Sequence, residues 1–324
     1  MANINIAFAF DSRVLKIFYV ALASLLKNRG ACHYDVYIVT PASVTEDEKK
    51  GISEFARGMD KSSRVVFLDP PDLSEILSDE LLRFGEGAWW RIGLYKILPE
   101  SVKSVIYMDH DVIVRGALDE LASLDFGGAY VAVKMGQTLE RKGSVGFDKY
   151  IRELWKNGET FNSGVMVFNL DAWRERDLYK EFVPLKDLDL LSDQERLNIV
   201  CRGKTLALDP EKYNITVNKT SAQNVIWHYP GDVKPWDFAN QSLDKTRGWW
   251  EYARLTPFYQ DFKDDFERMN LYVMQKNSRV AAVVPPASVS YSVLGLPILR
   301  AKTFRDKTTF RVLGLPVFKI KRKR

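Results

Sequence analysis

The first 115 residues alternate short apolar runs with longer segments of helical character, and this alternation limits the folds open to the chain. Strands are predicted at Asn3–Phe10, Tyr34–Val39, Val65–Leu68 and Ser104–Met108. Helices are predicted between them, at Phe18–Leu26, Thr45–Arg57 and Trp89–Leu98. This order predicts an α/β fold, with a mostly parallel sheet and helices on both faces. Ligands of such sheets bind outside the carboxyl ends of the strands, where Asp11 and Asp109 fall.

Length and composition limit the cellular setting. A chain of 324 residues, 46% of them hydrophobic, can form one large α/β domain with appendages, or two domains. Two cysteines, Cys32 and Cys201, provide no disulfide framework, which favours a reducing compartment. Residues 1–11 lack the basic segment of a signal peptide, and no apolar run is long enough to span a bilayer. We therefore expect a cytoplasmic protein.

Positive charge is concentrated at the C-terminus. Residues 300–324 hold ten of the 47 lysines and arginines but one of the 42 acidic residues, so the rest of the chain is slightly acidic. This distribution argues against a nucleic-acid-binding protein and for a tail that binds an anionic surface. The tail also contains a repeat, SVLGLPILR at 292–300 and RVLGLPVFK at 311–319, which can equally be a β-hairpin-like flap on the body. We expect the main α/β domain, which would carry the functional site, at 1–255, a helical extension at 256–290 and a basic, repeat-containing tail at 291–324.

Two aspartates directly follow the fourth predicted strand. Asp109 and Asp111 flank His110 in YMDHDVIV, and residues two apart in an extended chain point to the same side. Both carboxylates can therefore bind one hard cation, Mn²⁺ or Mg²⁺, which usually binds together with the phosphates of a substrate. Taken alone, a pattern this short and common favours an acidic turn between two strands.

A second polar segment follows another apolar run, in IWHYPGDVKPWD at 226–237. His228 offers an imidazole, which suits Mn²⁺ as a third ligand, although a single histidine at a strand end is often structural. Gly231 permits close approach of the backbone to a ligand, and Lys234 supplies a cation for a phosphate. Trp236 can stack on a sugar or fill the core.

Three further side chains are candidates for sugar binding, each with a structural alternative. Asn162 precedes the predicted strand Val165–Leu170 and can donate and accept hydrogen bonds, but Asn-Ser-Gly also favours a turn. Asp193 and Gln194 can bind sugar hydroxyls, although they also begin a helix, 193–200, that Ser192 can cap. Arg91 can equally pair with a nearby acid.

Five segments, in this order, resemble those of glycosyltransferase family 8, the retaining bacterial galactosyl- and glucosyltransferases of lipopolysaccharide and lipooligosaccharide cores. They are IAFAFD near the N-terminus, the segment around Arg91, YMDHDVIV, FNSGVMVFNLDAW at 161–173, and LSDQERLN at 191–198 followed by HYPGDVKPW. The resemblance implies a nucleotide-diphospho-sugar transferase fold of Rossmann type, which agrees with the predicted order of strands and helices.

The resemblance also implies site residues. The metal ligands, for Mn²⁺ or alternatively Mg²⁺, would be Asp109, Asp111 and His228. Residues that would contact the UDP-sugar donor, from the uridine to the sugar and the diphosphate, are Ala9, Asp11, Arg91, Asp109, Asn162, Asp193, Gly231 and Lys234. The catalytic residues would be Asp193 and Gln194, with Gln194 facing the anomeric carbon. The chain departs from the family at Arg13 and Val14, near the uridine, and at Lys134, where many members have an acid.

The implied activity is Mn²⁺-dependent transfer of galactose or glucose from UDP-galactose or UDP-glucose, with retention of configuration. The acceptor would be a lipid-linked oligosaccharide of a lipopolysaccharide or lipooligosaccharide, and the basic tail would hold the protein at the cytoplasmic face of the inner membrane. Since Gln194 is a poor nucleophile, front-side displacement is favoured over a covalent intermediate. Two alternatives remain open: a metal-dependent hydrolase and a non-catalytic sugar-nucleotide-binding protein.

Overall fold

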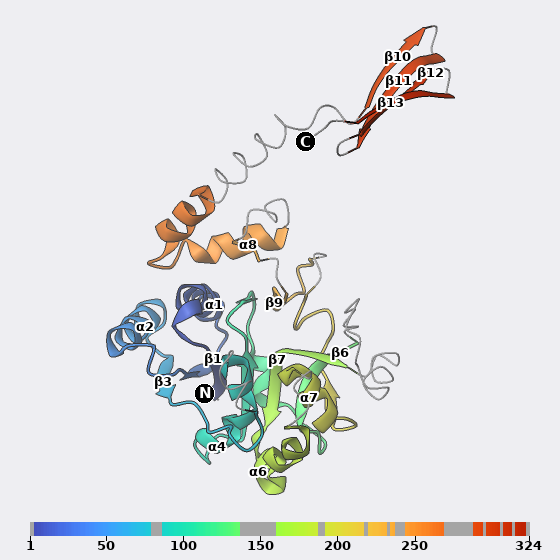
Figure 1. Cartoon of the computed structure of the whole chain (residues 1–324). Helices are drawn as coiled ribbons and strands as arrows, with labels where there is room; N and C mark the ends of the chain where they lie inside the picture. The colour runs from blue at the N-terminus through green and yellow to red at the C-terminus, as the bar shows by residue number, and fades with distance from the viewer. Residues whose placement is uncertain are drawn as a thin grey trace. The chain divides into compact units, whose positions relative to one another are not determined.

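The computed structural model contains two compact units, Met1–Phe262 and Lys263–Arg324 (Figure 1). It describes residues 3–78, 86–136, 160–186, 192–216, 220–231, 234–236 and 244–268, together with four strands between residues 288 and 321. Residues 259–268 are helical, whereas residues 269–287 of the helical extension predicted at 256–290 lie outside the described residues. None of the described helices is long and apolar enough to cross a membrane.

The first unit is built on a seven-stranded sheet with the order β3-β2-β1-β4-β7-β6-β8. Its strands are β1 (Asn3–Ala9), β2 (His33–Val39), β3 (Arg64–Leu68), β4 (Ser104–Met108), β6 (Val131–Met135), β7 (Phe161–Asn169) and β8 (Thr205–Ala207). The pairs β1–β2, β2–β3, β1–β4 and β6–β8 are parallel, whereas β7 is antiparallel to both β4 and β6. The mostly parallel, Rossmann-like sheet predicted from the sequence is confirmed.

Helices lie on both faces of this sheet. The α-helices are α1 (Leu15–Lys27), α2 (Glu46–Met59), α4 (Leu94–Ile97), α6 (Leu170–Arg176), α7 (Asp193–Val200) and α8 (Asp244–Ala253), with 3-10 turns at Ser12–Val14, Glu86–Gly93, Asp119–Ser123 and Leu178–Leu185. Because successive residues of a strand point to opposite faces, Ile6 and Phe8 of β1 pack with α1, and Ala7 packs in a second cluster with α4 and α6. The two clusters are the core.

Local sequence signals explain the first two helices. Thr45 caps α2 through a reciprocal capping box with Glu48, as the predicted start of that helix required. Helix α1 contains the predicted segment Phe18–Leu26 and is buried along nearly its whole length. It contacts α2, α8 and β5 (Val112–Val114), which explains why its apolar residues are not confined to one stripe.

The prediction of an α-helix at Trp89–Leu98 is wrong for the first half of that segment. Residues 86–93 form a 3-10 helix, and only the single turn Leu94–Ile97 is α-helical. Gly93 lies where the helix type changes, and a Cβ atom there would be 2.5 Å from the ring of Pro71. Glycine lowers helix propensity, and this close contact fixes the backbone at the junction. The tighter turn holds Arg91 in place, with its Nε donating to the carbonyl of Ala88 at 2.6 Å.

The turn considered for Asn162-Ser163-Gly164 does not form. All three residues belong to β7, which begins at Phe161 and is buried from Phe161 to Phe168. The flanking residues pair with the neighbouring strands, Phe161 with Met135 of β6 and Val165 with Met108 of β4, and this pairing overrides the local turn preference. Asn162 therefore lies in a strand inside the sheet, between β4 and β6, and not in a loop.

A small two-stranded ribbon extends from the main sheet. β5 pairs antiparallel with β9 (Ile226–His228), with Val112 opposite His228. Trp227 of β9 packs with Trp249 of α8 and with Ile113 in a third apolar cluster. The ribbon therefore connects the end of β4 to α8.

The second unit is a four-stranded antiparallel sheet. Its strands, in spatial order, are β10 (Ser288–Val293), β11 (Leu296–Phe304), β12 (Lys307–Val312) and β13 (Leu315–Lys321). Each copy of the repeat forms one hairpin, closed by Val293 opposite Leu296 and by Val312 opposite Leu315. Each hairpin also has a register shift next to its proline, so both copies adopt the same backbone arrangement.

Candidate functional site

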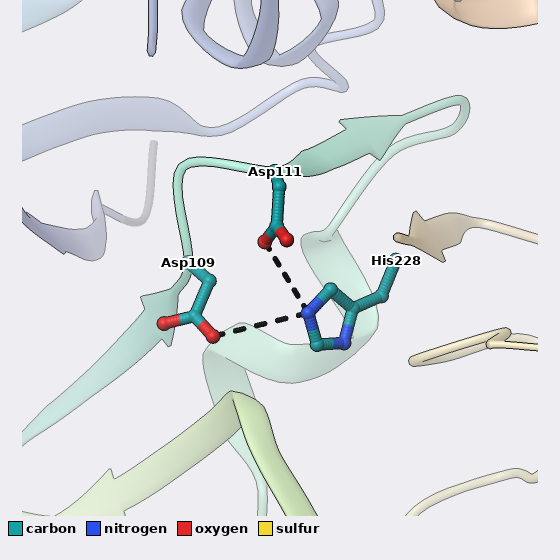
Figure 2. Close-up of side chains that lie close together, drawn as sticks. All are labelled: Asp109, Asp111 and His228. Carbon is teal, nitrogen blue, oxygen red and sulfur yellow. Dashed lines mark ion pairs between the residues drawn. The ribbon is translucent and has the colours of Figure 1, made fainter. Parts of the chain in front are cut away.

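Three side chains converge where β4, β5 and β9 meet (Figure 2). Asp109 follows β4, Asp111 directly precedes β5, and His228 ends β9. The Nε2 atom of His228 lies 3.3 Å from Oδ1 of Asp111 and 3.8 Å from Oδ2 of Asp109. One ligand atom from each residue lies within 4.8 Å of the others. The structure thus brings together the three metal ligands expected from the sequence.

The hydrogen bonds around this group fit a divalent cation. Nδ1 of His228 lies 2.9 Å from Oδ1 of Asn214, an acceptor, so Nδ1 donates this hydrogen bond and Nε2 is the nitrogen that faces the carboxylates. Oδ1 of Asp111 is buried and has no hydrogen-bond partner among the described residues. Buried acceptor atoms that face one another need a cation between them, and carboxylate with imidazole suits Mn²⁺.

Gly164 of β7 leaves space for this group. A Cβ atom at this position would lie 2.1 Å from Cε1 and 2.6 Å from Nε2 of His228, and 2.8 Å from Oδ2 of Asp109. Its carbonyl also accepts a hydrogen bond from the backbone N–H of Asp109 at 2.8 Å. Glycine is therefore required here because the ligands approach the backbone closely.

Arg91 is a buried cation that joins Asp109 to Asp193. Its guanidinium lies 3.0 Å from Oδ1 of Asp109 and 3.3 Å from Oδ2 of Asp193, and it donates to the carbonyl of Ser163 at 2.6 Å. Burial alone would lower the pKa of Arg91, but Asp109 and the other nearby acids outweigh it and raise that pKa. Burial also raises the pKa of the Asp193 carboxyl, an effect that Arg91 opposes. Tyr107 donates a further hydrogen bond to Asp109 at 2.8 Å.

Lys234 supplies a second cation beside the metal-ligand group. Its Nζ lies 2.6 Å from Oδ2 of Asp111 and donates to the carbonyl of Tyr229 at 2.8 Å. Burial raises the pKa of the Asp111 carboxyl, but His228 and Lys234 outweigh burial, so that pKa lies below its usual value. Gly231, in the same segment, has a φ of 81°, a left-handed conformation that favours glycine.

Asn162 and Gln194 contact each other directly. Oε1 of Gln194 accepts from Nδ2 of Asn162 at 2.8 Å and from the backbone N–H of Ser163 at 3.1 Å. The capping box between Ser192 and Glu195 forms as the sequence predicted and fixes the first turn of α7, which carries Asp193 and Gln194. The predicted cap is confirmed, and it is compatible with the other interpretation, in which Asp193 and Gln194 bind sugar hydroxyls.

A cleft at the carboxyl end of β1 and β4 lies beside the metal-ligand group. Among its lining residues are Ala9, Asp11, Arg91, Asp109, Asp111 and Lys234, six of the residues expected from the sequence. Asn162, Asp193 and Gln194 are joined to this cleft through Arg91, which contacts Ser163 and Asp193. The cleft residues, Asn162, Asp193 and Gln194 thus form one continuous group.

The three departures from the family have different positions. Arg13 and Val14 line the same cleft, and the guanidinium of Arg13 lies 2.6 Å from the carboxylate of Asp11. Arg13 lowers the pKa of Asp11 and shares a carboxylate that the resemblance assigns to the uridine site. Lys134 instead donates to the carbonyl of Asn214 at 3.4 Å, and burial lowers its pKa.

Sequence reasoning missed Asn214, Gly164 and Lys245 as parts of this site. Nζ of Lys245, on α8, donates to the carbonyls of His228 at 2.6 Å and Ile215 at 2.8 Å, and burial lowers its pKa to about 7. No motif marks Asn214 or Lys245, because their roles depend on a bridge between Ile215 and Trp227. Gly164 lies within a quoted motif, but the motif does not reveal which atoms approach it.

Comparison with known proteins agrees with this geometry. A model of glycosyl transferase family 8 matches residues 5–240. Lipopolysaccharide 1,2-glucosyltransferase of Escherichia coli is 24% identical over 73% of this chain and 74% of its own. Lipopolysaccharide 1,3-galactosyltransferase of Salmonella typhimurium is 22% identical over 72% of each.

A solved structure supports the fold. The crystal structure of the galactosyltransferase LgtC in complex with donor and acceptor sugar analogues matches with a TM-score of 0.64 and 19% identity, covering 78% of this chain and 96% of that one. The family model covers most of the chain, and the sheet, the cleft and the Asp109–Asp111–His228 group lie within the matched region. The chain therefore belongs to glycosyl transferase family 8.

Proposed function

We propose that this glycosyltransferase moves galactose or glucose from a UDP-sugar to a lipopolysaccharide, a lipooligosaccharide or a related glycan, with retention of configuration and with Mn²⁺ as cofactor. The observation that carries the proposal is the Asp109–Asp111–His228 group at the edge of a cleft that also contains Arg91 and Lys234. Paired carboxylates, an imidazole and two cations form a site for a diphosphate bound together with a divalent cation.

Different residues in and beside the cleft would bind different parts of a UDP-sugar. Ala9 and Asp11 would contact the uridine, since they lie at the end of β1 where such sheets bind nucleotides. Gly231 and Lys234 would contact the diphosphate, whose negative charge grows as UDP leaves. A bound Mn²⁺, or Mg²⁺ in its place, would supply further charge stabilisation for that leaving group.

The donor sugar would lie toward α7. Arg91, Asn162 and Asp193 offer a guanidinium, an amide and a carboxylate. Arg91 pairs with Asp193 and contacts Ser163, and Asn162 donates to Gln194. Gln194 would face the anomeric carbon, and its Oε1 already accepts two hydrogen bonds. A neutral amide engaged in this way is a poor nucleophile.

The contacts of Asp193 support retention by front-side attack. Asp193 is the carboxylate adjacent to Gln194, and its ion pair with Arg91 reduces its nucleophilicity. Front-side attack by the acceptor hydroxyl, with a UDP oxygen taking the proton, therefore fits the site better than a covalent intermediate.

The two alternatives are less well supported. Glycoside hydrolases place two carboxylates on opposite sides of the scissile bond, whereas Asp109 and Asp111 both face His228 (Figure 2). A non-catalytic sugar-nucleotide-binding protein would keep the cleft and the metal ligands, so turnover is needed to exclude it.

The proposal predicts transfer from a UDP-hexose. UDP-galactose and UDP-glucose should each be incubated with a core oligosaccharide acceptor, with and without Mn²⁺, alongside GDP-mannose as a donor of the wrong nucleotide. We expect a Mn²⁺-dependent product from a UDP-sugar whose anomeric NMR coupling shows the α linkage of the donor. A β-linked product would refute retention, and binding of UDP-sugar without turnover with any acceptor would favour the non-catalytic alternative.

We also propose that the C-terminal sheet binds the anionic cytoplasmic leaflet of the inner membrane. Its register places Arg300 opposite Arg311, Thr309 between Lys302 and Lys319, and Lys307 opposite Lys321. Opposite residues, and alternate residues of one strand, share a face of a sheet. Six basic positions therefore share one face: Arg300, Lys302, Lys307, Arg311, Lys319 and Lys321.

This arrangement predicts membrane binding that depends on charge. Each basic residue near an anionic leaflet is worth about 1 kcal/mol, so replacing Lys302, Lys307 and Lys319 with glutamine should weaken binding to phosphatidylglycerol vesicles roughly a hundredfold. A control variant with Lys50, Arg57 and Lys61 changed to glutamine loses the same charge from the first unit. Equal vesicle binding by the two variants in a sedimentation assay would contradict the proposal.

A further inference from the structure

We infer that Asn214 is a positioning residue that fixes the tautomer of His228 and connects the metal-ligand group to Asn162 and Gln194. The part of this inference that concerns Mn²⁺ rests on the proposed function. Asn214 is fully buried, and its Oδ1 lies 2.9 Å from Nδ1 of His228. It lies neither in the cleft nor in any segment that the sequence marked as functional.

The orientation of the Asn214 amide is determined by its other contacts. Nδ2 of Asn214 lies 3.2 Å from the carbonyl oxygen of Asn162 and 3.3 Å from its Oδ1. That Oδ1 already accepts from the backbone N–H of Gly164 at 3.0 Å. Because both atoms facing Nδ2 are acceptors, Nδ2 must be the donor, and Oδ1 must be the atom that faces His228.

The orientation of Asn214 determines the proton position on His228. A carbonyl oxygen beside Nδ1 requires the proton on Nδ1, so that Nε2 is the nitrogen available to a metal ion held by Asp109 and Asp111. The other tautomer would leave two acceptors in contact in a buried place and would block Nε2 as a ligand.

The backbone holds Asn214 in this position at some cost. Its φ of 53° is left-handed, a conformation that asparagine adopts more readily than other residues with side chains. The backbone N–H of His228 donates to the carbonyl of Ile215 at 3.1 Å, and Lys245 bridges the carbonyls of Ile215 and His228. These contacts keep the Asn214 segment and β9 together.

The same amide extends the connection to α7. Asn162 accepts from Asn214 through its carbonyl and Oδ1, and donates through Nδ2 to Oε1 of Gln194. A continuous series of hydrogen bonds therefore runs from His228 through Asn214 and Asn162 to Gln194. Displacing Asn214 should disturb both the metal ligands and the residue proposed to face the anomeric carbon.

Two substitutions distinguish the contact of Asn214 with His228 from its contact with Asn162. Asn214→Gly accommodates the left-handed backbone but removes both contacts. Asn214→Asp also tolerates that backbone and keeps an acceptor for His228, but it replaces the donor to Asn162 with an oxygen. Asn224→Ala is the matched control, since Asn224 is also buried and contacts Trp227, the neighbour of His228.

The first readout is the imidazole ¹⁵N spectrum of the metal-free protein at a pH high enough that each imidazole carries a single proton, and the chain's three histidines allow assignment. We expect a proton on Nδ1 of His228 in the unchanged protein, in Asn214→Asp and in Asn224→Ala, and a mixture of tautomers in Asn214→Gly. The second readout is titration with Mn²⁺ alone. Loss of such an outer contact typically weakens metal affinity about 10- to 100-fold, which we expect for Asn214→Gly but not for Asn214→Asp or Asn224→Ala.

The third readout is kcat for sugar transfer at saturating Mn²⁺, which should fall in Asn214→Asp because Asn162 loses its donor. An unchanged Nδ1–H tautomer and unchanged Mn²⁺ affinity in Asn214→Gly would overturn the inference. If the unchanged protein bound no Mn²⁺, the proposed metal dependence would be wrong, and the ¹⁵N spectrum of Asn214→Gly would still decide the role of Asn214.

Discussion

Replacing Asp111 with asparagine should abolish sugar transfer while the protein remains folded. The substitution keeps the shape of the side chain but removes the charge from a buried ligand atom that lies 3.3 Å from Nε2 of His228. Charge stabilisation by a metal is worth several kcal/mol in such reactions, so we expect kcat/KM to fall by about 10³ or more. A chelator should have the same effect on the unchanged protein, and added Mn²⁺ should reverse it.

Asp35→Asn is a suitable control for this experiment. Asp35 of β2 also has an ion pair, with Arg64 at 3.0 Å, but it lies at the opposite end of the strand from the cleft. We expect activity close to that of the unchanged protein for Asp35→Asn, and a cooperative thermal transition for both variants. Full activity in chelator, or in Asp111→Asn, would rule out a metal-dependent reaction at this group.

Gly164→Ala should have the second largest effect, although it adds a single methyl group. That methyl group would lie 2.1 Å from the His228 ring and 2.8 Å from Oδ2 of Asp109, so at least one ligand must move. We expect Mn²⁺ affinity and kcat/KM to fall by about 10² or more, and the free energy of unfolding to fall by about 1–3 kcal/mol from overpacking. Titration with Mn²⁺, turnover and denaturant unfolding measure the three quantities.

Gly58→Ala provides the contrast. Gly58 lies in α2, and a Cβ atom there would have no neighbour within 4 Å. Alanine should stabilise this helix by up to about 1 kcal/mol and leave Mn²⁺ affinity unchanged. If Gly164→Ala behaved like Gly58→Ala, the ligands would not occupy the positions described in this structure.

The parts of the fold that follow from local sequence were predictable. Apolar runs that end in a polar residue marked β1 and β4, and Thr45 with Glu48 marked the start of α2. The carboxyl ends of β1 and β4 also placed Asp11 and Asp109 at one edge of the sheet, where the cleft is found.

The parts that depend on tertiary contacts were not predictable. Asn162-Ser163-Gly164 favours a turn locally, but the flanking residues Phe161 and Val165 pair with β6 and β4 and keep the segment in β7. Asn214 lies 14 residues before His228, and nothing in that interval shows that its amide reaches the ring. The resemblance to a family supplied His228 as a ligand, whereas the reason for its tautomer became visible only in the structure.

The C-terminal hairpins have an evolutionary consequence. Each copy of the repeat closes its own pair of strands with the same register, and the pairs join side by side through β11 and β12. Duplication or deletion of one copy would lengthen or shorten the sheet by two strands without altering the remaining hairpin. The match to the family ends at residue 240, before these hairpins begin. We therefore expect related enzymes to differ in the number of hairpins while the glycosyltransferase domain stays the same, so that the proposed membrane attachment and catalysis can evolve separately.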